Sequence, residues 1–60
     1  MQQHILKVDG KITFKGEILS CIHAAIDAGY TRLLKTNATY TLTQLIDDAG
    51  RIATIEFVSE

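Results

Sequence analysis

The feature that most constrains the fold is one amphipathic segment, residues 16–29, with the sequence GEILSCIHAAIDAG. At about 100° per residue, apolar side chains gather on one side of a helix and polar side chains on the other. The apolar side consists of Ile18, Leu19, Cys21, Ile22, Ala25, Ile26 and Ala28. This arc spans roughly half the circumference, which is wider than the seam of a coiled coil. We therefore predict the chain's one long helix here, lying against a sheet.

Both ends of this segment carry residues that suit a helix terminus. Gly16 is an acceptable N-cap residue, and Glu17 places a negative charge beside the positive end of the helix dipole. Gly29 can adopt the left-handed conformation that follows many helix C-termini without a Cβ penalty. Tyr30 can then make the hydrophobic contact of a Schellman motif. The pattern therefore predicts a Schellman cap at Gly29.

The chain length makes stability the next constraint. A domain of 60 residues buries only about 60% of the surface that its unfolded chain exposes. Small domains compensate with disulfides, metal ions or oligomerisation. The single cysteine, Cys21, excludes an internal disulfide, and its helical position about 160° away from His23 prevents the two from sharing a metal ion. We expect one domain over residues 1–60, with Cys21 in the core, that associates with itself as a homodimer.

Composition also bears on location. The net charge is −1 and the chain has no run of 18 apolar residues. The N-terminal residues lack the charged and apolar regions of a signal peptide. We therefore expect a cytoplasmic protein without membrane contact, in which a lone thiol stays reduced.

Residues 4–15 form a predicted hairpin, because Asp9-Gly10 is a strong turn signal between two apolar stretches. A two-residue loop would place Lys7 opposite Ile12 and split the apolar residues between the two faces. A three-residue loop over residues 8–10, with Gly10 at a bulge, instead pairs Leu6 with Ile12 and His4 with Phe14. Because this register collects Leu6, Ile12 and Phe14 on one face, we predict the bulged loop.

The segment after the helix contains one ambiguity. Residues 30–36 are typical of a strand, residues 36–39 of a turn and residues 51–58 of a final strand. Between them, alternating threonines favour a strand, whereas three signals favour a helix. These signals are the i, i+3, i+4, i+7 spacing of Leu42, Leu45, Ile46 and Ala49, a capping box from Thr41 to Gln44, and Gly50 as the stop. We predict a short helix over residues 42–49.

The elements combine into an α+β domain of order ββαβαβ, with a mixed four-stranded sheet packed against one long and one short helix. If residues 40–50 form a strand, the order becomes ββαβββ with a single helix. The final strand carries apolar residues on both faces, which suggests that one edge is covered. We predict this strand as the edge used for dimerisation, through Ile52, Thr54, Glu56 and Val58.

No residue pattern in the sequence indicates catalysis. His23 and Asp27 have the spacing of a helical pair, but no nucleophile accompanies them. Asp47 and Asp48 would diverge by about 100° on a helix, which is typical of a solvated helix end rather than of paired catalytic carboxylates. The glycines are isolated and match no phosphate-binding motif. We therefore expect a protein that is not an enzyme and has no catalytic residue, cofactor or metal.

The uneven distribution of charge along the chain indicates binding rather than catalysis. Residues 1–35 carry five basic residues against three acidic ones, whereas residues 36–60 carry one against four. Such a distribution suits head-to-tail contact or a basic ligand site. The candidate partner-binding residues are Lys7, Lys11, Lys15, Arg32 and Lys35. We expect them to bind an acidic surface of an unidentified protein, as in small bacterial or phage accessory proteins. The alternative is a weak nucleic-acid site, with Phe14 or Tyr30 as a stacking ring.

Overall fold

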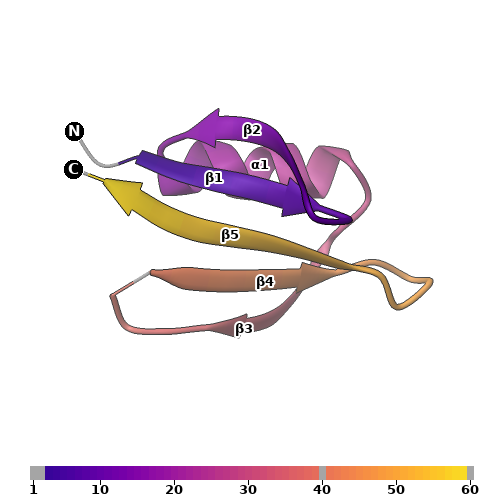
Figure 1. Cartoon of the computed structure of the whole chain (residues 1–60). Helices are drawn as coiled ribbons and strands as arrows, with labels where there is room; N and C mark the ends of the chain where they lie inside the picture. Colours follow the sequence, from indigo (N-terminus) through magenta and orange to yellow (C-terminus); the bar gives the residue numbers. More distant parts are fainter. Residues whose placement is uncertain (1–2, 40, 60) are drawn as a thin grey trace.

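The computed structural model describes residues 3–39 and 41–59. The chain folds as β1 (Gln3–Val8), β2 (Lys11–Gly16), α1 (Ile18–Asp27), β3 (Arg32–Thr36), β4 (Leu42–Ile46) and β5 (Ile52–Ser59). All neighbouring strands are antiparallel, and the sheet order is β2-β1-β5-β4-β3. The helix packs on one face of this sheet, against β1, β2 and β5 (Figure 1). The protein is therefore a small α+β domain with one helix and a five-stranded sheet.

The predicted helix over residues 42–49 is wrong, and with it the mixed four-stranded sheet and the second helix. Residues 42–46 form β4, which pairs with β3 on one side and with β5 on the other. Pairing on two sides satisfies the backbone of β4, and the alternation along it buries Thr43 and Leu45. The structure thus has the ββαβββ order that the sequence left as the alternative.

The first hairpin also differs from the prediction, since its loop has two residues rather than three. Asp9 and Gly10 both have positive φ, 55° and 77°, as a type I′ turn requires. Lys7 therefore lies opposite Ile12. The register then shifts between Leu6 and Lys7, so that Leu6 pairs with Phe14. This irregularity within β2 returns Phe14 to the face of Leu6 and leaves Ile12 on the opposite face.

The ends of α1 confirm the C-terminal prediction and correct the N-terminal one. The N-cap residue is Glu17 rather than Gly16, and its side chain makes no capping hydrogen bond. At the other end, Gly29 has φ of 104°. Its N–H donates to the carbonyl of Ile26 at 3.0 Å, and the N–H of Tyr30 donates to that of Ala25 at 3.0 Å. These two bonds form the predicted Schellman motif.

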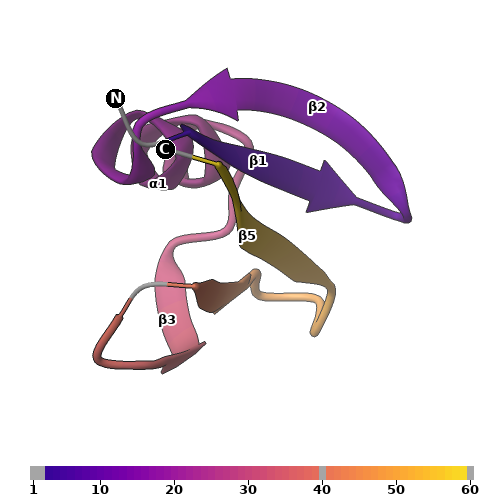
Figure 2. The same cartoon turned by 60° about the vertical axis from the view of Figure 1, so that its left-hand side comes forward.

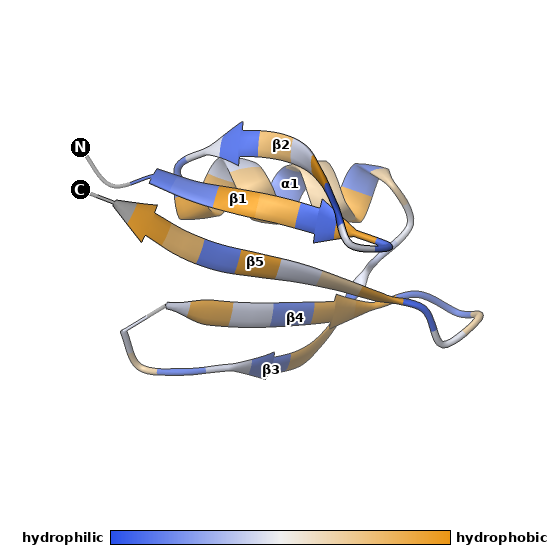
Figure 3. Cartoon of the chain, in the orientation of Figure 1, coloured by the Kyte–Doolittle hydropathy of each residue, from blue (hydrophilic) through white to orange (hydrophobic). Residues whose placement is uncertain are grey.

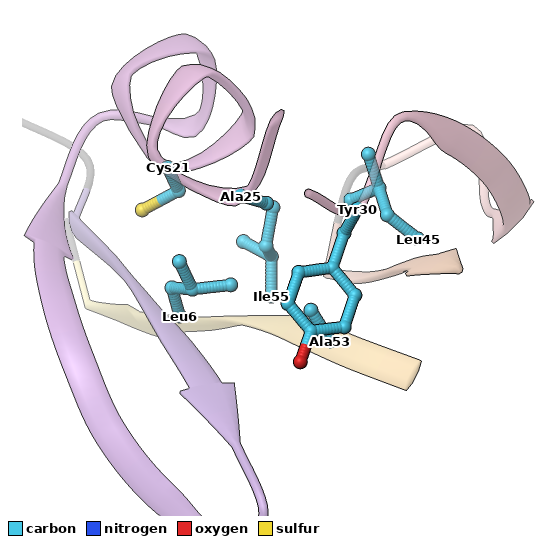
Figure 4. Packing of buried hydrophobic residues seen from close by; sticks show 7 residues of the cluster. All are labelled: Leu6, Cys21, Ala25, Tyr30, Leu45, Ala53 and Ile55. Atoms are coloured by element: carbon cyan, nitrogen blue, oxygen red, sulfur yellow. The ribbon is translucent and has the colours of Figure 1, made fainter. Parts of the chain in front are cut away.

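The core lies between α1 and the sheet (Figure 4). Its buried apolar residues are Leu6, Cys21, Ala25, Tyr30, Leu45, Ala53 and Ile55. The helix contributes two small side chains, Cys21 and Ala25, which have no exposed surface. The sheet covers less of the apolar arc than we predicted, because Leu19 is 66% exposed and Ile26 is 42% exposed. Part of the helix's apolar surface therefore remains on the outside of the molecule.

Candidate interaction surface

Helix α1 packs over β1, β2 and β5 on one face of the sheet, and no helix of the described residues covers the other face, which we call the open face. Cross-strand pairing assigns three rows of residues to it. The first row is Ile12, Lys7, Thr54, Gln44 and Lys35. The second is Lys15, Ile5, Glu56 and Leu42. The third is Ile52, Ile46 and Arg32. The open face thus runs across all five strands.

The open face combines aliphatic and basic side chains. Five of its residues are aliphatic, and two of these, Ile12 and Ile52, are 51% and 44% exposed. Four are basic, against the single acidic residue Glu56. Figure 3 shows hydrophobic and hydrophilic residues interspersed along the strands. A surface with this composition offers apolar contact area and an excess of positive charge to whatever binds it.

The four open-face cations differ in their contacts. Lys7 forms an ion pair with Glu56, with Nζ 3.2 Å from Oε2. A guanidinium nitrogen of Arg32 donates to the backbone carbonyl of Asp47 at 3.3 Å. Lys15 and Lys35 take part in none of the ion pairs found among residues 3–39 and 41–59. The charge of these two lysines is the part of the open face that an acidic ligand can neutralise.

The structure brings together four of the five basic residues that the sequence singled out. Lys7, Lys15, Arg32 and Lys35 share the open face, on β1, β2 and β3. Lys11 pairs with Val8, so it belongs to the helix side at the end of the hairpin. The two pairs of cations are not contiguous, since β5 and β4 separate β1 from β3. With strands about 4.8 Å apart, roughly 14–19 Å lies between the two groups.

The prediction that β5 is the dimerisation edge is wrong. This strand is central and pairs with β1 on one side and β4 on the other, so it offers no free backbone edge. Its four predicted contact residues instead alternate with Ala53, Ile55 and Phe57, and face away from the helix. The residues concerned are Ile52, Thr54, Glu56 and Val58. They contribute to the open face or its border, and their role in association stays a prediction.

The true edges of the sheet are β2 and β3 (Figure 2). Each edge strand carries two basic residues, Lys11 and Lys15 on β2 and Arg32 and Lys35 on β3. The pairing of each with its neighbour contains an irregularity in register. Lysines and bulges on edge strands oppose uncontrolled pairing with other chains. These basic residues therefore oppose pairing at the edges, and all of them except Lys11 also charge the open face.

Asp47 holds the turn between β4 and β5, which the prediction of a solvated helix end missed. Its side chain is buried, and Oδ1 accepts hydrogen bonds from the N–H groups of Ala49 at 3.0 Å and Arg51 at 2.8 Å. The Nε of Arg51 donates to Oδ2 at 2.8 Å. Burial alone would raise the pKa of Asp47, but these hydrogen bonds and the Arg51 charge outweigh it and lower that pKa. Its neighbour Asp48 has a side chain that is 99% exposed and lies 4.0 Å from a guanidinium nitrogen of Arg32.

The lowered pKa of Asp47 predicts acid sensitivity. A carboxylate with a folded pKa below its unfolded value of about 3.9 stabilises the protein above that pH, and its contribution is lost as pH falls further. We expect Asp47→Asn to lower the melting temperature at neutral pH by about 5 °C or more. The variant should also lose less stability than the wild type between pH 5 and pH 2. Thermal melts over this range should show no such change for the matched control, Asp48→Asn.

Two further side chains that could react or bind a metal, those of Cys21 and His4, lie in the interior. The Cys21 thiol approaches the backbone carbonyl of His4 at 3.6 Å, and burial raises the pKa of this thiol. The His4 ring lies edge-on to Phe57, with ring centroids 5.4 Å apart. Cys21 is thus the core residue that we predicted. Within the described ranges, no three His, Cys, Asp or Glu side chains form a group that can hold a metal ion.

Among the described residues, no helix has the length and apolar character needed to cross a membrane. Comparison of the chain with protein-family models, with curated proteins and with solved structures finds no match.

Proposed function

We propose that the protein is a small protein-interaction module without catalytic activity, acting in the cytoplasm, whose open face binds an acidic and partly apolar protein surface. The observation that carries this proposal is the composition of the open face. Four cations and a single acid lie among five aliphatic side chains on one uncovered side of the sheet. Aliphatic contact area supplies affinity, while complementary charge supplies orientation and discrimination.

The side chains with chemistry that could serve catalysis have structural roles in this fold. These roles support a protein that binds rather than catalyses. Asp47 and Arg51 hold a turn through three hydrogen bonds with distances of 2.8–3.0 Å. Cys21 and His4 are buried in the interior. These side chains stabilise the fold that presents the open face.

A protein partner is favoured over nucleic acid by the position of the aromatic rings. Single-stranded nucleic acid binds to cationic surfaces that also carry aromatic stacking platforms. Phe14 pairs with Leu6 on the helix side, Phe57 lies against His4, and Tyr30 is buried in the core. Phe14 therefore lies on the side of the sheet opposite the open face, and Tyr30 is buried, so neither ring can stack on a ligand of the open face. Aliphatic residues occupy the open face instead, and they suit an apolar protein surface.

Selection of ligands from a displayed peptide library tests this proposal. The wild type should enrich peptides in which Asp or Glu alternates with aliphatic residues. The double variant Lys15→Glu/Lys35→Glu should lose this enrichment, because it reverses both unpaired charges on the open face. Lys11→Glu is the matched control and should retain it. Enrichment that survives the double variant, or none with the wild type, would contradict the proposal.

The salt dependence of binding distinguishes a nucleic-acid partner from a protein partner. Binding to phosphates releases counterions, so affinity falls steeply with salt concentration. Fluorescence anisotropy with single-stranded and duplex DNA at low salt should give no saturable binding. A salt-sensitive complex that requires Lys15 and Lys35 would indicate that the open face binds nucleic acid rather than a protein.

A further inference from the structure

We infer that the open face binds helix α1 of a second copy of this chain, in a head-to-tail arrangement. This inference rests on the proposed function, because it names one acidic and apolar partner for the same face. It requires a surface on the molecule that complements the open face in both charge and polarity. The outer side of α1 has both properties.

The outer side of α1 presents an apolar stripe. Leu19 and Ile26 are 66% and 42% exposed. They are seven residues apart, which is about two helical turns, so they lie almost on one line along the helix. Ile22, which is half-buried, lies beside this line and borders the core. We call Leu19, Ile22 and Ile26 the helix stripe.

The helix stripe lies between two acidic residues. Glu17 is exposed before the first turn, and Asp27 is exposed in the last turn. Neither carboxylate takes part in an ion pair within the described part of the chain. Residues 16–31 contain no lysine and no arginine. The outer surface of α1 therefore carries the apolar helix stripe beside the exposed polar side chains of Ser20 and His23, and it is negatively charged at both ends.

Symmetric contacts would oppose these charges. Packing two open faces together would bring one cationic surface against another, and packing two helix stripes together would bring two acidic surfaces together. Pairing two β2 edges or two β3 edges would place basic residues against basic residues on irregular strands. Of these contacts, the unlike one, helix stripe on open face, is the one that joins opposite charges and apolar surfaces at once.

The head-to-tail contact has a structural consequence. Docking α1 of one copy on the open face of another places a helix on each face of the sheet, which gives a three-layer arrangement of helix, sheet and helix. The contact is heterologous, so each copy still presents one unused surface of each kind. Such contacts continue until they close into a ring or extend as a filament. We therefore expect association beyond a dimer as concentration rises.

Sedimentation velocity over a range from low to high micromolar concentration tests the inference. At low salt, the wild type should increase in mass with concentration, and high salt should weaken the association. Asp27→Lys on the helix and Lys35→Glu on the open face should each raise the apparent dissociation constant at least about tenfold. The matched control Lys11→Glu, which changes a charge outside the open face, should assemble as the wild type does. Leu19→Gln should also weaken assembly, since this side chain is exposed and its loss leaves the core intact.

Mixing variants gives the most specific result. Asp27→Lys and Lys35→Glu should each be deficient alone, and an equimolar mixture should recover association, because the new lysine then meets the new glutamate. A wild type that stays monomeric throughout would overturn the inference and leave the proposed function to the peptide selection. Loss of assembly with Asp27→Lys but not with Lys35→Glu would also overturn it, because that pattern indicates contact between two helices.

Discussion

Replacement of Ile55 by alanine is expected to leave much of the protein unfolded at room temperature. Ile55 has no exposed surface and lies on the central strand, facing α1 (Figure 4). Truncating a buried isoleucine to alanine costs about 2–5 kcal/mol. A domain of this size has a total stability of roughly 3–9 kcal/mol. The substitution therefore removes a large share of the free energy of unfolding.

Denaturant titration with circular dichroism measures this effect, and Ile52→Ala is the matched control. Ile52 is on the same strand, three residues away, but its side chain is 44% exposed on the open face. We expect this control to cost less than about 1 kcal/mol, provided that both proteins are compared at low concentration. Equal losses for the two variants would contradict the assignment of the two faces of β5.

The second large effect is expected at Gly29, where Gly29→Val should destabilise the protein by about 1–3 kcal/mol. The φ of Gly29 is 104°, and an added Cβ would meet no atom within 4 Å. The cost is therefore conformational, because a β-branched residue disfavours this region of backbone space. The Schellman hydrogen bonds from Gly29 and Tyr30 depend on that conformation.

Ser20→Val provides the comparison for Gly29→Val in thermal melts. Ser20 is exposed within α1, and valine there should cost at most about 0.7 kcal/mol. We expect the melting temperature to fall markedly further for Gly29→Val. Equal shifts would mean that the end of the helix tolerates another geometry, and the cap assignment would then be wrong.

Features set by neighbouring residues were predictable from the sequence. The helix, its C-terminal cap and the burial of Cys21 depend on spacing within about fourteen residues, and each agrees with the structure. The helix started one residue later than predicted because two residues, Gly16 and Glu17, each suit the cap position. Local patterns therefore identified the one helix and the side of it that carries the core.

Residues 42–49 show why local patterns fail elsewhere. The helical spacing of Leu42, Leu45 and Ile46 is real, but β4 gains backbone partners from two neighbouring strands that lie elsewhere in the sequence. The same residues satisfy strand alternation, because Leu45 faces α1 while Leu42 and Ile46 belong to the open face. Tertiary pairing decided between two patterns that the segment fits almost equally well.

The candidate surface was only partly predictable for the same reason. Sequence identified the basic residues, but strand order decided which of them share a face, and that order depends on pairing between distant segments. The central position of β5 follows from its pairing with β1, over forty residues earlier in the chain. The aliphatic half of the surface was missed, although alternation along residues 52–58 already separated Ile52 from Ile55. The alternation was interpreted as evidence for an edge strand, whereas it separates the two faces of a central strand.

The measurement that tests most directly whether the protein associates through the open face is a dilution series of methyl spectra from isoleucine-labelled protein. Ile12, Ile46 and Ile52 report on the open face, Ile26 on the helix stripe, and Ile55 on the core. We predict that the open-face and helix-stripe methyl signals shift with concentration while the Ile55 signal stays constant. Signals that do not change with concentration, or changes that spare both the open face and the helix stripe while the mass rises, would contradict this account.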